Sequence, residues 1–334
     1  MEARLVDALP SGSGWQFEPK WDGFRCLASR NGPNVTMSAK SGKTLARYFP
    51  ETVEHLAALP IAKDPFVLDG ELAIPVGSTL DFEALQLRLH PAESRIKKLA
   101  LETPAIFIVF DLVMAPGGTS LIDRPLLERR AALESFFSAL GPHPALRLSP
   151  YTRQRSTAQG WLNRAQGALD GVLAKRLDEP YLMGERGWLK IKRLRTADCV
   201  VGGFRYATDS KLVGSMLLGL YDDEGVLHHV GFTSGIANNV RASLTKKLES
   251  LRGGPGFTGN APGGPSRWST ERSEQWEPLK PKLVAEVQYD HVTGNRFRHG
   301  TRFLRWRPDK APRQCTFDQL QSEARPSRLL AGIV

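Results

Sequence analysis

Glu18-Pro19-Lys20-Trp21-Asp22-Gly23-Phe24-Arg25 is the stretch around which the rest of this 334-residue chain can be organised. A lysine stands two residues before an aspartate and a glycine, inside an alternating run that begins at Trp15. Alternation of this kind predicts a strand that presents the lysine on one face. A reactive lysine needs neighbours that bind phosphate and metal, so the other charged residues of the chain decide what the stretch means.

The composition is that of a folded, basic, globular protein. Hydrophobic residues make up 41% of the chain and charged residues 24%, which excludes a disordered chain. The chain has 45 Lys+Arg against 35 Asp+Glu, a net charge of +10, which suits a polyanionic partner, nucleic acid before an anionic membrane. The three cysteines lie far apart without a CxxC pair, which argues against a zinc cluster and a disulfide framework.

Two observations bear on the compartment. The N-terminal residues lack the basic and apolar regions of a signal peptide. The most apolar run, residues 105–116, is too short to span a bilayer and contains Asp111. We therefore expect a cytoplasmic protein that does not enter a membrane.

The chain changes in character near residue 195. Before that point, strand-like runs (15–29, 34–38, 66–74, 105–113, 172–176 and 188–193) alternate with helical ones (48–59, 81–89, 91–101, 125–140 and 156–167). After it come five short strands, at 200–204, 215–221, 226–232, 283–289 and 301–306, with one helix at 239–251. This second pattern is typical of a small barrel of the oligonucleotide-binding type, the OB-fold. We expect an α+β protein with a mixed domain at 1–195, containing antiparallel sheets, and an OB-fold domain at 196–334.

Several charged side chains lie in runs that are apolar enough to be buried strands. They are Glu71 in VLDGELAI, Asp111 in IFIVFDLV, Asp170 in DGVLAKR, and Lys190 and Lys192 in WLKIK. A buried charge is costly unless it is paired or binds a ligand. For any one of them a strand end that reaches solvent is the simpler explanation, but five in one chain favour a shared site.

The spacing of these charges indicates phosphate chemistry. Lys190 and Lys192 are two residues apart in a strand, so both ammonium groups point to one face. Two adjacent ammonium groups suit a polyphosphate, and they favour the neutral amine that a nucleophilic lysine needs. Glu71 and Asp170 could bind Mg²⁺ that bridges phosphates. The residues alone therefore predict a lysine that attacks a metal-bound nucleotide phosphate.

In their order, these pieces resemble the covalent nucleotidyltransferases, and most closely the ATP-dependent DNA ligases of the short bacterial ligase C group. The resemblance extends from Trp15 to about Pro312. It implies that Lys20 becomes adenylated, that Glu18 reads the adenine amino group, and that Arg25 lies near the ribose and phosphates. It also implies that the adenine stacks between Phe110 and Leu173.

The same resemblance assigns the phosphate and metal contacts. Glu71 would serve ribose or metal, Asp170 would bind metal, and Lys190 and Lys192 would bind phosphate. In the barrel domain, the resemblance implies that the departing pyrophosphate is oriented by three residues of the sequence FLRWRPDK: Arg307, Asp309 and Lys310. The implied ligands are ATP and Mg²⁺ or Mn²⁺.

The implied activity is the sealing of nicks in duplex DNA by a monomeric, nucleoid-associated bacterial repair enzyme. Two departures stand out: Lys40 replaces an arginine expected to contact the DNA 5′-phosphate, and Asp170 replaces a glutamate. An RNA ligase and an mRNA capping guanylyltransferase share most of these motifs. A non-catalytic nucleic-acid-binding module is a further alternative, although it would have no reason to retain Lys20 with the phosphate and metal residues.

Overall fold

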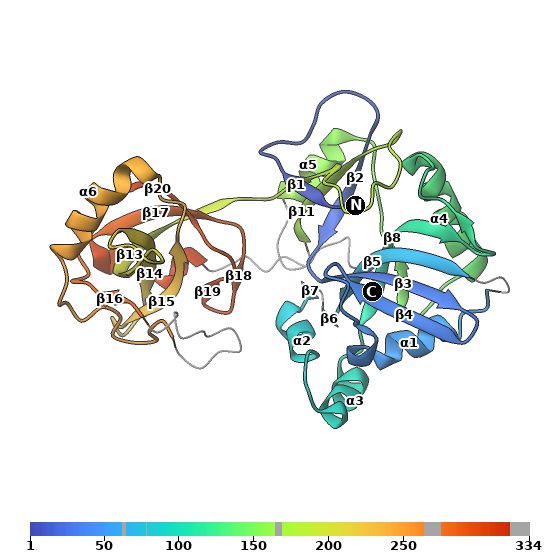
Figure 1. Ribbon diagram of the computed structural model, residues 1–334, viewed down its shortest axis with the longest axis horizontal. Coiled ribbons are helices and arrows are strands. Elements are labelled where there is room, and N and C mark those ends of the chain that lie inside the picture. The colour runs from blue at the N-terminus through green and yellow to red at the C-terminus, as the bar shows by residue number, and fades with distance from the viewer. Residues whose placement is uncertain (62–64, 78, 164–168, 264–274, 321–334) are drawn as a thin grey trace. The chain divides into compact units, whose positions relative to one another are not determined.

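The computed structural model describes residues 1–61, 65–77, 79–163, 169–263 and 275–320. These residues form two compact units, Met1–Arg193 and a second unit that begins at Leu194 (Figure 1). Each unit has its own hydrophobic core. The architecture is of the predicted α+β class, with mainly antiparallel sheets in the first unit and a barrel in the second.

The smaller sheet of the first unit carries the lysine stretch. Its strands lie in the order β1 (Ala3–Leu5), β12 (Trp188–Ile191), β11 (Leu169–Arg176) and β2 (Trp15–Trp21). One face is apolar and packs on α5 (Arg155–Asn163) through residues that include Phe17, Val172 and Ile191. Because strand side chains alternate between faces, the polar residues between them point to the opposite face.

The larger sheet of the first unit supplies most of the core. Its main path runs β10 (Leu146–Leu148), β8 (Ile106–Ala115), β5 (Phe66–Ala73), β3 (Phe24–Asn31) and β4 (Asn34–Ala39), and β9 (Thr119–Ser120) pairs with β8. Helices α1 (Pro50–Ala57) and α4 (Leu126–Leu140) bury Leu56 and Leu133 against this sheet (Figure 1). Shorter elements are β6 (Pro75–Val76), β7 (Thr79–Leu80), α2 (Phe82–Leu87) and α3 (Glu93–Glu102).

The turn Asp22–Gly23 carries the chain from the small sheet into the large one. It separates β2, which ends at Trp21, from β3, which begins at Phe24. A Cβ atom at Gly23 would lie 2.2 Å from the carbonyl oxygen of Leu72 and 2.8 Å from Cγ of Glu71. Only glycine allows the turn to approach β5 so closely, which explains physically why this residue follows the aspartate.

The second unit is a barrel with the OB-fold connectivity. Its sheet runs β15 (Leu227–Thr233), β14 (Val213–Tyr221), β13 (Arg195–Tyr206), β17 (Val284–Tyr289) and β20 (Arg302–Trp306). A parallel bridge between Thr233 and Thr301 joins the two ends, so the sheet closes. Helix α6 (Asn238–Glu249) lies between the third and fourth strands in chain order, as in OB-folds. Three short strands complete the unit: β16 (Glu277–Pro278), β18 (Val292–Thr293) and β19 (Arg296–Phe297).

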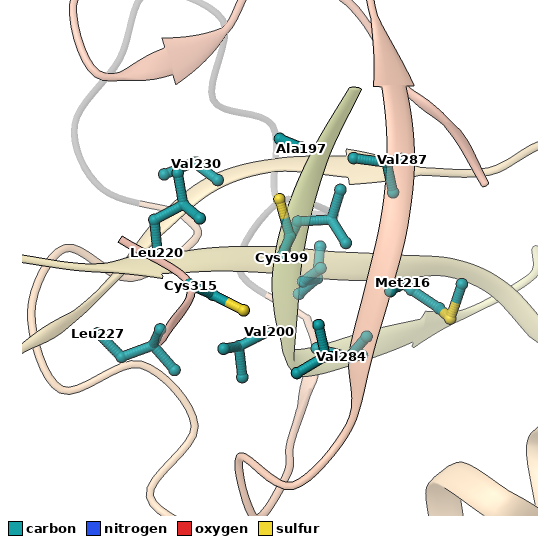
Figure 2. Close-up of a cluster of buried hydrophobic side chains, with 14 of the residues drawn as sticks. Ala197, Cys199, Val200, Met216, Leu220, Leu227, Val230, Val284, Val287 and Cys315 are labelled. Atoms are coloured by element: carbon teal, nitrogen blue, oxygen red, sulfur yellow. The ribbon is translucent and has the colours of Figure 1, made fainter. Parts of the chain in front are cut away.

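The hydrophobic core of the second unit includes many small and medium apolar side chains. Figure 2 shows Ala197, Cys199 and Val200 of β13 beside Val284 and Val287 of β17. All three cysteines of the chain are buried free thiols. Asp198 lies between the core residues Ala197 and Cys199 of β13, so alternation directs its side chain to the face opposite to theirs.

The structure departs from the sequence expectations in several places. Strands β1 and β10 were not expected, and each has only three residues. The helix expected at 156–167 is Arg155–Asn163, and 164–167 lie outside the described residues. The strand expected at 200–204 is longer, Arg195–Tyr206, because its first residues pair with β17. No helix among the described residues is long and apolar enough to cross a membrane.

Candidate active site

The small sheet of the first unit brings several of the predicted site residues together on its polar face. In the register of β2, β11 and β12, Leu173 lies opposite Glu18 on one side and opposite Lys190 on the other, and Gly171 lies opposite Lys20. Residues that are directly opposite share a face of the sheet. Glu18, Lys20, Leu173 and Lys190 therefore line one surface.

Asp170 reaches Lys20 because of an irregularity in the sheet. The register of β11 against β2 shifts between Leu169 and Gly171, which leaves Asp170 as an extra residue on β11. Its Oδ2 atom lies 2.6 Å from Nζ of Lys20 and 3.1 Å from Nζ of Lys192. Burial opposes ionisation of this carboxyl, but the two ammonium groups outweigh it and hold its pKa below the usual value.

Gly171 makes this bulge sterically feasible. Its φ is +143°, and a Cβ atom there would lie 2.1 Å from the carbonyl oxygen of Ile191.

On the neighbouring strand β12, the ammonium of Lys190 is partly buried. Burial first, and then the charges of Lys192 and Lys20, lower the pKa of Lys190. Three lysines and one aspartate thus form a concentrated positive site, which suits a polyanionic ligand.

Arg25 and Glu71 come from adjacent strands of the larger sheet, where they are direct cross-strand partners. Arg25, however, binds a different carboxylate: its Nε and Nη2 donate to Asp69 at 3.1 and 2.7 Å. The hydroxyl of Tyr181 donates to the same carboxylate at 2.7 Å. Burial raises the pKa of Glu71 to about 8, with the charges of Asp22 and Asp69 adding to the effect against the attraction of Lys20 and Arg25. Asp69 and Tyr181 were not predicted, although Asp69 lies in the same charged strand that drew attention to Glu71.

Glu18 is held in a fully buried polar cluster. Its Oε2 lies 2.7 Å from Nζ of Lys175, and its Oε1 accepts a hydrogen bond from Nε2 of Gln16 at 2.8 Å. Lys175, in the same run DGVLAKR as Asp170, was not predicted to belong to the site. Its ammonium lies 4.6 Å from the ring centre of Phe110 and 4.1 Å from that of Trp188. Phe110, the predicted adenine-stacking residue, thus borders the cluster.

Three polar atoms of this cluster make no hydrogen bond within the described part of the chain: Oε1 of Gln16, Oε2 of Glu18 and Nζ of Lys175. The close approach of Lys175 to Glu18 is therefore an ion pair whose atoms retain hydrogen-bonding capacity. Buried polar groups usually find partners. The free Oε1 of Gln16 and the remaining hydrogen-bonding capacity of the Glu18–Lys175 pair, beside an aromatic ring, suit a flat, polar, aromatic ligand.

The predicted barrel residues form a separate ionic cluster within the second unit. Arg307 donates from Nη1 to both carboxylate oxygens of Asp198 at 2.9 Å, and from Nη2 to Asp309 at 2.8 Å. Nζ of Lys310 donates to Oδ2 of Asp198 at 2.9 Å. Asp198 was not predicted. Like Glu71, it is a carboxylate within an apolar run of strand-forming residues, and this feature of the sequence could have drawn attention to it.

The remaining predictions concern metal and DNA. Among the described residues no group of three or more His, Cys, Asp or Glu side chains is placed to hold a metal ion. Glu71 and Asp170 remain suitable oxygen ligands, since Mg²⁺ is commonly held by one or two carboxylates together with substrate phosphates. Lys40 lies just after β4, is exposed, and pairs with Glu2 at 3.0 Å.

Comparison with known proteins identifies the family. Residues 5–192 match the family described as "ATP dependent DNA ligase domain", and residues 209–310 match the "ATP dependent DNA ligase C terminal region". DNA ligase C2 of Mycolicibacterium smegmatis is 44% identical, over 96% of this chain and 94% of that protein. DNA ligase C of Mycobacterium tuberculosis is 41% identical, over 96% and 93%.

A solved structure of a Lig E DNA ligase superimposes with a TM-score of 0.57 at 18% identity, covering 92% of this chain and 99% of that one. At this identity the likeness concerns the fold, and it agrees with two units of the kind described. Both family matches and the identity of the curated relatives lead to one conclusion. The chain belongs to the ATP-dependent DNA ligases, and within them it is similar to the short bacterial ligase C type.

Proposed function

We propose that the chain seals nicks in duplex DNA through a covalent AMP on Lys20. The observation that carries the proposal is the contact of Lys20 with Asp170, shared with Lys192, on a face that also presents Glu18 and Lys190. A nucleophilic amine beside several cations is what attack on a polyphosphate requires. Attack of Nζ on the α-phosphorus of ATP forms a nitrogen–phosphorus bond and releases pyrophosphate.

The later steps use the same group of charges. AMP passes from Lys20 to the 5′-phosphate at the nick, and the 3′-hydroxyl then displaces AMP to join the strands. A divalent cation, Mg²⁺ or Mn²⁺, held by Glu71 and Asp170 would neutralise phosphate charge. Lys190 and Lys192 bind the phosphates of the nucleotide, and Arg25 supports this end of the site from its pair with Asp69.

The cluster around Glu18 can hold the hydrogen-bonding edge of adenine. That edge places an amino donor beside a ring-nitrogen acceptor, so it needs an acceptor and a donor side by side in the protein. Glu18 and Gln16 offer buried acceptors next to the ammonium donor of Lys175. We infer that this group reads adenine, while Phe110 and Leu173 hold its two faces. The matches to the ATP-dependent DNA ligase families favour ATP over GTP and argue against a capping guanylyltransferase.

We propose that the two units act as the adenylation domain (1–195) and the OB-fold domain (196–334). In the second, Arg307, Asp309 and Lys310 orient the leaving pyrophosphate. Because both units belong to one chain, one copy suffices for the reaction. Any repair that resynthesises a strand ends with a nick, so we place the activity in DNA repair, in the cytoplasm at the nucleoid.

The experiment uses the purified chain with Mg²⁺ and α-labelled ATP or GTP, followed by denaturing electrophoresis. We expect label from ATP to remain on the chain, and K20A and K20R to abolish it. K20R keeps a cation opposite Asp170, so its failure would show that the amine is needed as a nucleophile. Label from GTP would indicate capping chemistry, and label that survives both substitutions would refute Lys20. Sealing of nicked DNA against nicked RNA then separates DNA ligase from RNA ligase.

A further inference from the structure

A row of charges crosses three strands on the outside of the barrel. In the register of the sheet, Asp198 of β13 lies opposite Glu286 of β17, and Glu286 lies opposite Arg305 of β20. Arg307 follows immediately after β20, and its backbone N–H donates to Val284 at 2.9 Å. This backbone contact fixes where the Arg307 side chain starts. The guanidinium extends from there to Asp198 rather than into solvent.

Asp198 joins the two cations that are proposed to act on pyrophosphate. Its Oδ2 accepts from Nη1 of Arg307 and from Nζ of Lys310, both at 2.9 Å. Asp198 is 8% exposed as a residue, whereas the side chains of Arg307 and Lys310 are 21% and 22% exposed. The carboxylate thus lies beneath two cations that retain access to solvent. Without the carboxylate of Asp198 between them, the positive charges of Arg307 and Lys310 would repel each other and move apart.

Asp198 is itself fixed from a second direction. Its backbone N–H donates to Oε1 of Gln319 at 2.8 Å, and Nε2 of Gln319 donates to the Asp198 carbonyl at 3.1 Å. Gln319 lies in the short helix Phe317–Leu320. The neighbouring Glu286 binds Arg305 at 2.5 Å and stands 4.0 Å from Arg307, so it adds little to the Arg307 geometry. Asp198 is therefore a rigid anchor that Arg307 and Lys310 share.

We propose that Asp198 is a positioning residue for the adenylation step. It sets the distance and orientation between Arg307 and Lys310, so that both can bind the departing pyrophosphate together. The carboxylate does not touch the substrate in this role. The inference rests on the proposed function of Arg307 and Lys310, and the experiment below separates the two.

The substitution is D198N, and the two chemical steps are measured separately. The first assay follows transfer of labelled AMP from ATP to the protein. The second follows sealing of a nick whose 5′-phosphate already carries AMP, a step in which no pyrophosphate takes part. We expect D198N to slow adenylation by about 10- to 100-fold, the cost typical of misplaced binding groups, and to leave sealing nearly unchanged. D198E, which keeps the charge, should recover part of the adenylation rate.

A matched control tests whether loss of barrel stability alone could give this result. Thr245 in α6 accepts from the Val213 N–H at 2.9 Å and donates to the Arg241 carbonyl at 2.7 Å. T245A removes these buried bonds and leaves the contacts of Asp198 intact. It should change both steps together or neither. If D198N also slowed both steps equally, or left adenylation unchanged or faster, the positioning role would be refuted.

Two further variants distinguish failure of this inference from failure of the proposed function. If R307A and K310A leave adenylation intact, the proposed role of those cations is wrong, and with it the reason for an anchor. If they slow adenylation but D198N does not, only the anchor is wrong. Thermal unfolding shows whether D198N folds. If it does not, D198E carries the test: slower adenylation with normal sealing supports the anchor, and equal loss of both steps overturns it.

Discussion

Two aspartates, one in each unit, use the same device in different settings. Oδ2 of Asp170 lies 2.6 and 3.1 Å from two lysine ammonium groups, and Oδ2 of Asp198 lies 2.9 Å from a guanidinium and an ammonium. Asp170 is the extra residue of a bulge, whereas Asp198 lies in regular register and its backbone is bound by Gln319. We propose that the bulge aims Asp170 at the nucleophilic lysine and at a metal ion, whereas Asp198 serves only as an anchor for two cations.

The largest effect in this comparison should come from D170N. Loss of the charge leaves Lys20 and Lys192 to repel each other and removes a proposed metal ligand. We expect both lysine adenylation and sealing of pre-adenylated nicks to slow, each by roughly 100-fold. D198N should affect only the first of these steps. Normal sealing by D170N would contradict the difference drawn between the two aspartates, and D170E is the control that keeps the charge.

The buried ion pair Glu18–Lys175 can be compared with an exposed ion pair that has the same nitrogen–oxygen distance, so that only burial differs. Its nitrogen–oxygen distance is 2.7 Å, and the exposed pair Glu93–Lys97 on α3 has the same distance. Removing one partner of a buried pair typically costs about 3–5 kcal/mol, because the other charge is left alone in the interior. E18Q and K175M should each lower the free energy of unfolding by that amount, and the double variant by much less than the sum.

The exposed pair supplies the control in the same denaturation experiment. The side chains of Glu93 and Lys97 are 72% and 67% exposed. E93Q and K97M should therefore change the free energy of unfolding by less than about 1 kcal/mol. If the buried and exposed substitutions cost the same, the two charges of the Glu18 cluster are not isolated from water, and the proposed adenine site is not enclosed.

The fold could be predicted where periodicity is strong. Alternation placed Glu18 and Lys20 on one face of a strand, and the same rule placed Lys190 on a strand face two positions from Lys192. The five barrel strands and α6 follow from hairpin spacing and a helical run. The three-residue strands β1 and β10 could not be predicted, because three residues do not define a period and each is held only by its neighbour.

It was harder to predict which charged side chains pair with each other than to predict which face of a strand each one occupies. Nothing in the sequence shows that Arg25 chooses Asp69 over its direct partner Glu71, because a diagonal contact depends on side-chain rotamers. Asp198 and Lys175 were visible as charges in apolar strands. Their partners come from distant segments, so only the structure could say what each one binds. The sequence does not reveal the bulge at Asp170. It shows only Gly171, the glycine that permits the bulge.

The pKa of Glu71 gives a test of moderate size. Burial raises this pKa from 4.5 to about 8, so between these values the folded chain keeps the proton that the unfolded chain loses. The contribution of Glu71 to stability is complete below about pH 4.5 and is lost as the pH rises to about 8. The free energy of unfolding of the unsubstituted chain relative to E71Q should fall across this range, by a few kcal/mol at most. E83Q, at an exposed position, should give a curve parallel to the unsubstituted chain, and a flat difference for E71Q would contradict the raised pKa.

The smallest effect should come from substitution of Lys40, because its charge is exposed rather than enclosed. Its side chain is 60% exposed and its pair with Glu2 at 3.0 Å lies at the surface, so breaking that pair costs little stability. We expect K40A to weaken binding of nicked DNA a few-fold at low salt, less at high salt, and to leave adenylation unchanged. K40R should bind the 5′-phosphate at least as well, since its fork allows two hydrogen bonds. E2Q should tighten binding slightly by releasing Lys40. Salt-independent loss, or loss of adenylation in K40A, would place this lysine inside the nucleotide site rather than at the DNA.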